Sequence, residues 1–197
     1  SMGNQLTFSG SGELDNGLNV SISFVLDQGD DTATQIGSGT NTVGTGAPFD
    51  SHSVSISSDE LGTLKFHGEG GSSAQAAIDT TAAGDIWDSG FGVSTANDPK
   101  TSKGSDNMIV YTLPSIMDGV GLTASYTPKG SAAAASMAYA ISYTGFEGLT
   151  LDYATGEDDS TAGSESDTTT IKASYAYGPL TVSYSQTEFD GAGTAAN

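Results

Sequence analysis

Apolar residues recur at every second position in short runs along most of the chain, with Ser, Thr or Asn between them. Residues 18–24 read Leu-Asn-Val-Ser-Ile-Ser-Phe, and residues 180–185 read Leu-Thr-Val-Ser-Tyr-Ser. A two-residue period makes one face of a strand apolar and the other polar. The chain carries no amphipathic helical pattern that would cover such a sheet. The pattern therefore predicts an all-β fold, an antiparallel transmembrane barrel whose apolar side faces lipid and whose hydroxyl side faces water.

The spacing of the runs adds a second feature. We predict ten strands, over residues 4–12, 18–27, 51–58, 63–69, 106–114, 120–127, 135–144, 149–155, 167–177 and 180–188. The tail from Phe189 onward is predicted to be a loop. Gaps after the odd-numbered runs are short, and gaps after the even-numbered runs are longer. Outer-membrane barrels have this asymmetry, with tight periplasmic turns at one end and larger external loops at the other.

Aromatic side chains are expected to form a girdle at each membrane interface. The predicted topology places one group at the short-turn end and another toward the long-loop end. The first group is Tyr143, Tyr175 and Tyr177, and the second is Phe24, Tyr126, Tyr153 and Tyr184. The alternative is that tyrosine is simply common in strands.

Composition narrows the classes of partner. The chain has 24 acidic residues against 5 Lys and no Arg, for a net charge of -19. Such a surface repels nucleic acid, so cations are the charged partners we expect. Absence of Cys excludes disulfides and thiolate chemistry. No apolar run is long enough for a transmembrane helix, which needs about 20 residues.

Three segments resemble a known family: residues 6–27, 53–71 and 106–127, of which the second contains a Gly-Thr-Leu core between two strands. In order and spacing they resemble the Gram-negative trimeric porins of the alphaproteobacterial type. The resemblance implies a 16-stranded barrel in the bacterial outer membrane, assembled as a homotrimer. It also implies that residues 70–105 form the loop that folds inward and constricts the pore.

The chain departs from that family in length and in charge. Its opening resembles the second and third strands of the family, and strands are also missing behind, so residues 1–197 are interpreted as a single, incomplete barrel domain. The family often places an Arg cluster on the pore wall, whereas this chain has no Arg.

Candidate pore residues follow from this interpretation. Asp79, Asp85 and Asp88, with Trp87 between two of them, are predicted to line the constriction and favour cations. The alternative is that they are solvated loop acids.

On the strand 63–69, the polar residues Lys65, His67 and Glu69 alternate with apolar ones and are predicted to face the lumen. Asp152 and Lys172 fall on lumen positions by the same alternation. A charge on the lipid face would cost about 2–4 kcal/mol at mid-bilayer. Lys65 could instead pair with a loop carboxylate.

Nothing in the sequence indicates an enzyme. The two His residues, at 52 and 67, lie on different predicted strands and lack a metal-ligand spacing, and no nucleophile or phosphate-loop motif occurs. No metal site and no cofactor are expected. Residues 27–31 and 157–159 are dense in carboxylates that could hold Ca²⁺, although neither run has EF-hand spacing.

The sequence thus predicts a passive channel for small hydrophilic solutes and ions, with membrane lipid around it and a preference for cations. The alternative is a secreted or surface β-rich acidic adhesin or structural protein, stiffened by calcium. A third interpretation is an exported fragment with no function of its own.

Overall fold

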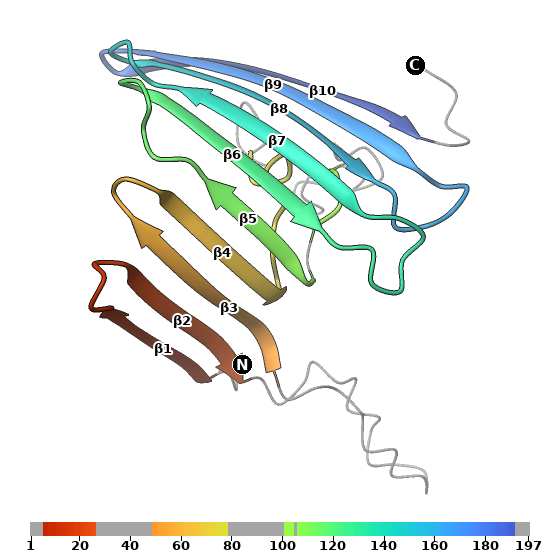
Figure 1. Ribbon diagram of the computed structural model, residues 1–197. Helices are drawn as coiled ribbons and strands as arrows, with labels where there is room; N and C mark the ends of the chain where they lie inside the picture. The colour runs from red at the N-terminus through yellow and green to blue at the C-terminus, as the bar shows by residue number, and fades with distance from the viewer. Residues whose placement is uncertain (1–5, 27–48, 79–100, 105, 192–197) are drawn as a thin grey trace, which may run out of the picture.

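The computed structural model describes residues 6–26, 49–78, 101–104 and 106–191. They form one antiparallel sheet in which each strand pairs with its neighbours in the sequence, as predicted (Figure 1). The strands are β1 (Leu6–Glu13), β2 (Asn19–Leu26), β3 (Phe49–Ser58), β4 (Gly62–Glu69), β5 (Met108–Thr112), β6 (Val120–Thr127), β7 (Ser136–Tyr143), β8 (Leu149–Asp158), β9 (Ser166–Tyr177) and β10 (Leu180–Gly191). Within these ranges no helix is long and apolar enough to cross a membrane.

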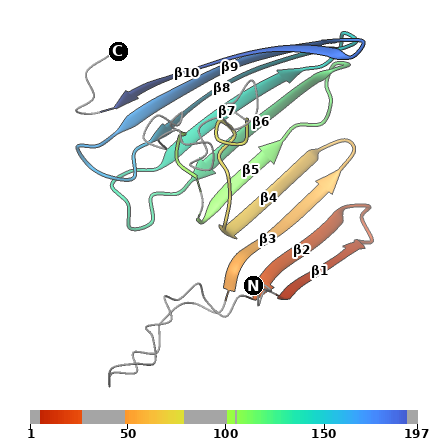
Figure 2. The ribbon, with the colours of Figure 1, turned by 180° about the vertical axis from the view of Figure 1, so that it is seen from behind.

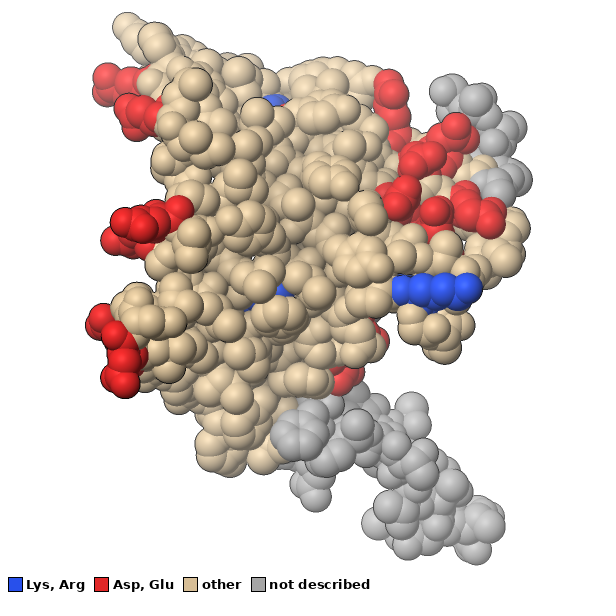
Figure 3. Space-filling view, viewed as in Figure 1, with Lys and Arg blue, Asp and Glu red and all other residues tan. Residues whose placement is uncertain are grey.

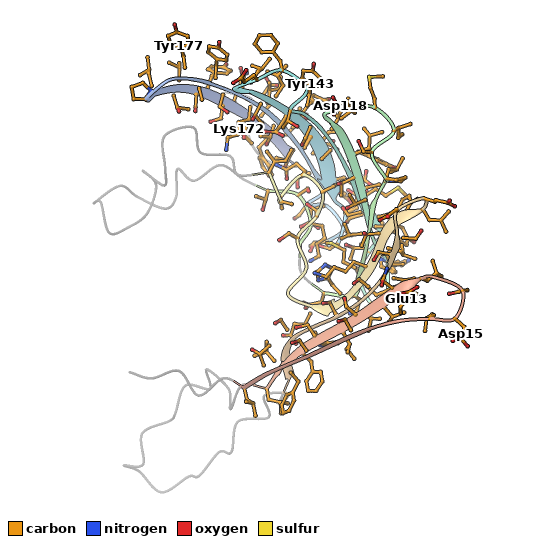
Figure 4. The ribbon with its side chains drawn as sticks, turned by 90° about the vertical axis from the view of Figure 1, so that its left-hand side faces the viewer. Glu13, Asp15, Asp118, Tyr143, Lys172 and Tyr177 are labelled. Atoms are coloured by element: carbon orange, nitrogen blue, oxygen red, sulfur yellow. The ribbon has the colours of Figure 1, made fainter. Side chains whose placement is uncertain are left out.

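The sheet curls into an open trough, with β1 along one edge and β10 along the other (Figures 1 and 4). The short connections all lie at one end of the strands. Gly17 and Gly62 adopt positive φ angles of 81° and 77° at two of these turns, a conformation that other residues rarely take. Antiparallel pairing keeps the alternating faces of neighbouring strands matched, apart from irregularities in register beside Phe24 on β2 and His52 on β3.

The two faces of the trough differ in chemistry. Large apolar side chains point from the convex face: Ile22, Ile141 and Ile171 are 47%, 42% and 47% exposed. Phe8 and Phe24 stack there with ring centroids 5.0 Å apart. A row of exposed apolar residues on every strand is unusual for a protein surface in water, and it matches a surface that contacts acyl chains.

Acidic side chains lie mainly near the ends of the strands and not in their middle (Figure 3). Acidic side chains gather at both ends of the sheet, and the convex face between the ends is nearly free of them (Figure 3). Glu13 and Asp15 lie at the short-turn end, as does Asp118 (Figure 4). An apolar band between two polar rims is the arrangement that a bilayer requires of a barrel wall.

Several predicted boundaries are wrong. β8 continues to Asp158 and β10 to Gly191, so the predicted loop from Phe189 begins as strand. Tyr184 therefore lies nearer the short-turn end of β10 than the long-loop end where it was predicted. The predicted contrast between short and long connections is weak in the second half of the sheet. The connections 128–135 and 159–165, predicted to be long, have much the same length as the turn 113–119.

Candidate pore wall and loop anchor

Short hydroxyl side chains line the concave face of β1–β3. Cross-strand pairing places Ser9 beside Ser23 and Ser23 beside Ser53, with a parallel row of Ser11, Ser21 and Ser55. The Oγ atoms of Ser21 and Ser55 are 2.6 Å apart. The alternation that turns Val and Ile outward therefore turns a continuous hydroxyl surface inward.

Each row continues into a basic side chain on β4. His67 pairs with Ser53, and Lys65 pairs with Ser55. Together with Glu69 they border a polar cleft of about 230 Å³, whose other lining residues are Ser23, Ser51, His52, Ser53 and Gly70. Phe66, between the two basic residues, points outward and is 40% exposed. The structure thus brings the three predicted wall residues of β4 to one cleft, and their role in a pore stays a prediction.

Asp152 and Lys172 lie directly opposite each other on β8 and β9. Lys172 points into the hollow of the trough, whereas Tyr143 and Tyr177 lie on the outer side (Figure 4). Because directly paired residues share a face, Asp152 lies on the same concave side. The predicted wall residues therefore form two groups, one on β4 and one on β8–β9.

The two ends of the segment 70–105 pack against the concave face of β6–β9, visible from behind in Figure 2. Ser73, Gln75 and Ser102 are at most 3% exposed. The Gln75 amide nitrogen donates to Thr170 Oγ1 (2.9 Å), and its Oε1 accepts from the Ser102 backbone N–H (2.7 Å). The Ala74 N–H donates to Ser125 Oγ (2.9 Å).

One further contact joins the two ends to each other, and another joins the returning end to the wall. The Oγ atoms of Ser73 and Ser102 are 2.7 Å apart in a buried position. The Lys103 N–H donates to the carbonyl of Glu157 on β8 (3.2 Å). Residues 73–78 form a single turn, in which the Ala77 N–H donates to the Ser73 carbonyl (2.9 Å). We call the buried set Ser73, Gln75, Ser102, Ser125 and Thr170 the loop anchor.

Sequence reasoning missed the loop anchor. Its residues are Ser, Thr and Gln, types that are frequent throughout the chain and have no spacing that marks them. One signal was available: Gln75 is the only long polar side chain in the segment 71–78, among Ser and Ala. A long amide side chain among small residues can reach hydrogen-bond partners on another strand.

The wall opposite the anchor fits it closely. A Cβ added at Gly156 would lie 2.5 Å from both the Ala138 Cβ and the Ser102 Oγ, so glycine leaves the room that Ser102 occupies. Thr168, beside Gly156 in the sheet, is fully buried, and its Oγ1 has no hydrogen-bond partner among the described residues.

The predicted constriction residues Asp79, Asp85, Trp87 and Asp88 lie outside the described residues. The inward path of residues 70–105 therefore stays a prediction. What the structure describes is that both ends of this segment lie on the concave face.

Carboxylates at the end of β8 and in the connection 159–165 are engaged with protein groups. Glu157 Oε1 accepts from the Met137 N–H (3.1 Å), and Asp158 Oδ1 accepts from the Ser160 N–H (3.0 Å). Backbone N–H groups of Gly163 and Glu165 hold the pKa of the Glu165 carboxyl below its usual value. No group of three or more His, Asp or Glu in the described ranges is arranged to hold a metal ion. The run 27–31 lies outside those ranges.

Comparison with protein families settles the affiliation of the chain. The sequence model of the Gram-negative porins matches residues 1–197. This chain belongs to the Gram-negative porin family. The family resemblance of the sequence is thereby confirmed, and this porin chain is a bacterial outer-membrane protein and not an enzyme.

Solved porin structures share the fold. This porin chain is similar to an anion-selective porin from Comamonas acidovorans, with 19% identity and a TM-score of 0.57 over 96% of this chain and 59% of that one. It is also similar to a mutant of the Rh. blastica porin, with 16% identity and a TM-score of 0.50 over 96% of this chain and 75% of that one. A comparison with curated proteins gave no match. The chain thus spans less than two thirds of the length of the Comamonas porin.

Proposed function

We propose that the protein containing this chain forms a water-filled channel in the outer membrane, through which small hydrophilic solutes and ions diffuse passively. The observation that supports this most is the contrast between the two faces of one sheet. Apolar residues such as Ile141 and Ile171 cover the convex side, while hydroxyl rows such as Ser9, Ser23 and Ser53 cover the concave side. Diffusion through such a passage needs no cofactor.

The proposed channel prefers cations. The chain has a net charge of -19 and no Arg, and fixed acidic groups near a passage raise the local concentration of cations. Asp79, Asp85 and Asp88, with Trp87, are proposed to set the charge and width of the narrow point. The Comamonas porin is anion-selective, which does not argue against this, because selectivity depends on the residues of the site rather than on the fold.

The assembly proposed for the full-length protein is a homotrimer surrounded by lipid. Ca²⁺ on the acidic external connections is a further proposal, and isothermal titration with Ca²⁺ showing no heat would dismiss it. Neither property is needed for the diffusion of solutes through a single barrel.

The experiment uses the full-length protein in planar bilayers under a KCl gradient. Reversal potentials of the sign set by K⁺ flow are expected. An anion-selective sign would defeat the cation preference, and failure to form any conducting pore would defeat the channel itself.

A further inference from the structure

Segment 70–105 is anchored far from where it leaves the sheet. The segment begins where β4 ends. Its Gln75 side chain is hydrogen-bonded to Thr170 on β9. From β4 to β9 is five strand steps, which is roughly 24 Å along the curved sheet at about 4.8 Å per step. The wall contact of Gln75 therefore lies far along the sheet from the strand that the segment leaves.

Gln75 is placed to do this. Its side chain is fully buried, and its one amide group binds two different parts of the molecule. The nitrogen donates to the wall at Thr170 Oγ1, and the oxygen accepts from the Ser102 N–H on the returning end of the segment. Thr170 is linked in turn to Thr187 on β10, with their Oγ atoms 3.0 Å apart.

We propose that Gln75 is a positioning residue, a latch that keeps the described arms of the segment, residues 71–78 and 101–104, docked on the β6–β9 wall. This rests on the proposed channel function. A buried amide gains its hydrogen bonds only in the docked position, and a buried partner left without one is costly. Docked and undocked positions are therefore two separate states, and Gln75 biases the first.

The test is a labelling experiment on the full-length porin in outer-membrane vesicles. The chain contains no Cys, so Ala74→Cys introduces a single thiol on the anchored end, at a position only 2% exposed. A hydrophilic maleimide reacts with that thiol when the segment undocks. Its reaction rate therefore reports the undocked fraction, whether or not the protein conducts.

Two variants break the latch from opposite sides. Gln75→Leu removes the amide, and Thr170→Val removes the hydroxyl on the wall with little change of shape. Each is expected to speed labelling of the thiol at position 74 by about tenfold, as the loss of one or two buried hydrogen bonds implies. If Gln75→Leu fails to assemble, Thr170→Val alone carries the test, because it lies on the wall and leaves the segment unaltered.

The matched control is Thr169→Val. Thr169 is the next residue on β9, on the convex face, and its Oγ1 lies 3.2 Å from that of Thr155. Thr169→Val also removes a threonine hydroxyl, and it is expected to leave the labelling rate unchanged. Unchanged labelling in both Gln75→Leu and Thr170→Val would overturn the latch.

Conductance separates the latch from the channel. In planar bilayers both latch variants are expected to show larger and more variable single-channel conductance than the parent. A parent that forms no pore refutes the proposed function and leaves the labelling result standing. A conducting parent whose variants label at the parent rate refutes only the latch.

Discussion

Thr168 and Thr170 lie two residues apart on the same face of β9 and are both fully buried, yet only Thr170 has a hydrogen-bond partner among the described residues. Thr170 accepts from the Gln75 amide, 95 residues away in the sequence. The same residue type in the same strand thus has two energetic roles. The Thr170 hydroxyl binds the Gln75 side chain of the loop anchor, whereas the Thr168 hydroxyl has no hydrogen-bond partner among the described residues.

The first prediction compares these two threonines. Thr170→Val leaves the Gln75 amide without its acceptor and should lower the free energy of unfolding by about 1–3 kcal/mol. Thr168→Val removes a hydroxyl that has no described partner, so it should be neutral or stabilising. Urea unfolding of the full-length protein in detergent measures both. An equal loss in the two variants would contradict the contrast.

The second prediction concerns the two ends of the loop anchor. Ser73→Cys with Ser102→Cys should form a disulfide under mild oxidation, because the two Oγ atoms are only 2.7 Å apart and a disulfide needs close Cβ atoms. Closing a loop of this size should stabilise the protein by about 3–4 kcal/mol. Mass spectrometry after alkylation detects the bond. Two freely alkylated thiols in the folded protein would show that the ends are not joined as described.

The third prediction tests the fit of the wall. Gly156→Ala places a methyl group against Ser102 and Ala138, and overpacking of this kind costs about 1–3 kcal/mol. We expect a lower unfolding midpoint in urea. Gly121→Ala is the matched control, since an added Cβ there meets nothing within 4 Å. A Gly156→Ala protein as stable as the control would mean that Ser102 does not occupy this space.

The fourth prediction concerns wall charge. Neutralising Lys65 or Lys172 as Lys65→Gln or Lys172→Gln should shift the reversal potential toward stronger cation preference, because each removes a positive charge from the concave face. Asp152→Asn should shift it the other way. These shifts in reversal potential should grow as ionic strength falls, because the Debye length increases.

Lys129→Gln is the control for this series. Lys129 is exposed in the connection between β6 and β7, outside the strands that form the concave face. Its loss should leave the reversal potential nearly unchanged. Equal shifts from Lys129→Gln and Lys65→Gln would show that net charge, and not the wall, sets selectivity.

Alternation of residue types was enough to predict the strands. β6 has the predicted bounds, Val120–Thr127, because a two-residue period and a glycine at the turn leave no other register. The end of β10 was misjudged because residues 189–191 break the alternation of apolar and polar residues, although they still pair with Ser166, Asp167 and Thr168 on β9.

The site was predictable only in part. That Lys65 and His67 share the concave face follows from their spacing along one strand. That Lys172 lies opposite Asp152 depends on the register across the β8–β9 connection, which no turn motif in the sequence fixes. Gln75 could not be matched to Thr170 from the sequence, because many wall hydroxyls are chemically equivalent and only the path of the chain chooses among them.

The hydroxyl rows on β1–β3 bear on how fast a solute would travel. A short Ser side chain donates and accepts hydrogen bonds with equal ease, so a hydrated molecule moving past Ser53, Ser23 and Ser9 can trade one water at a time for a protein partner and back again. No single contact holds it long. Solutes should therefore diffuse along β1–β3 with a low barrier. Their path should lie closer to these strands than to the β6–β9 wall that carries the loop anchor.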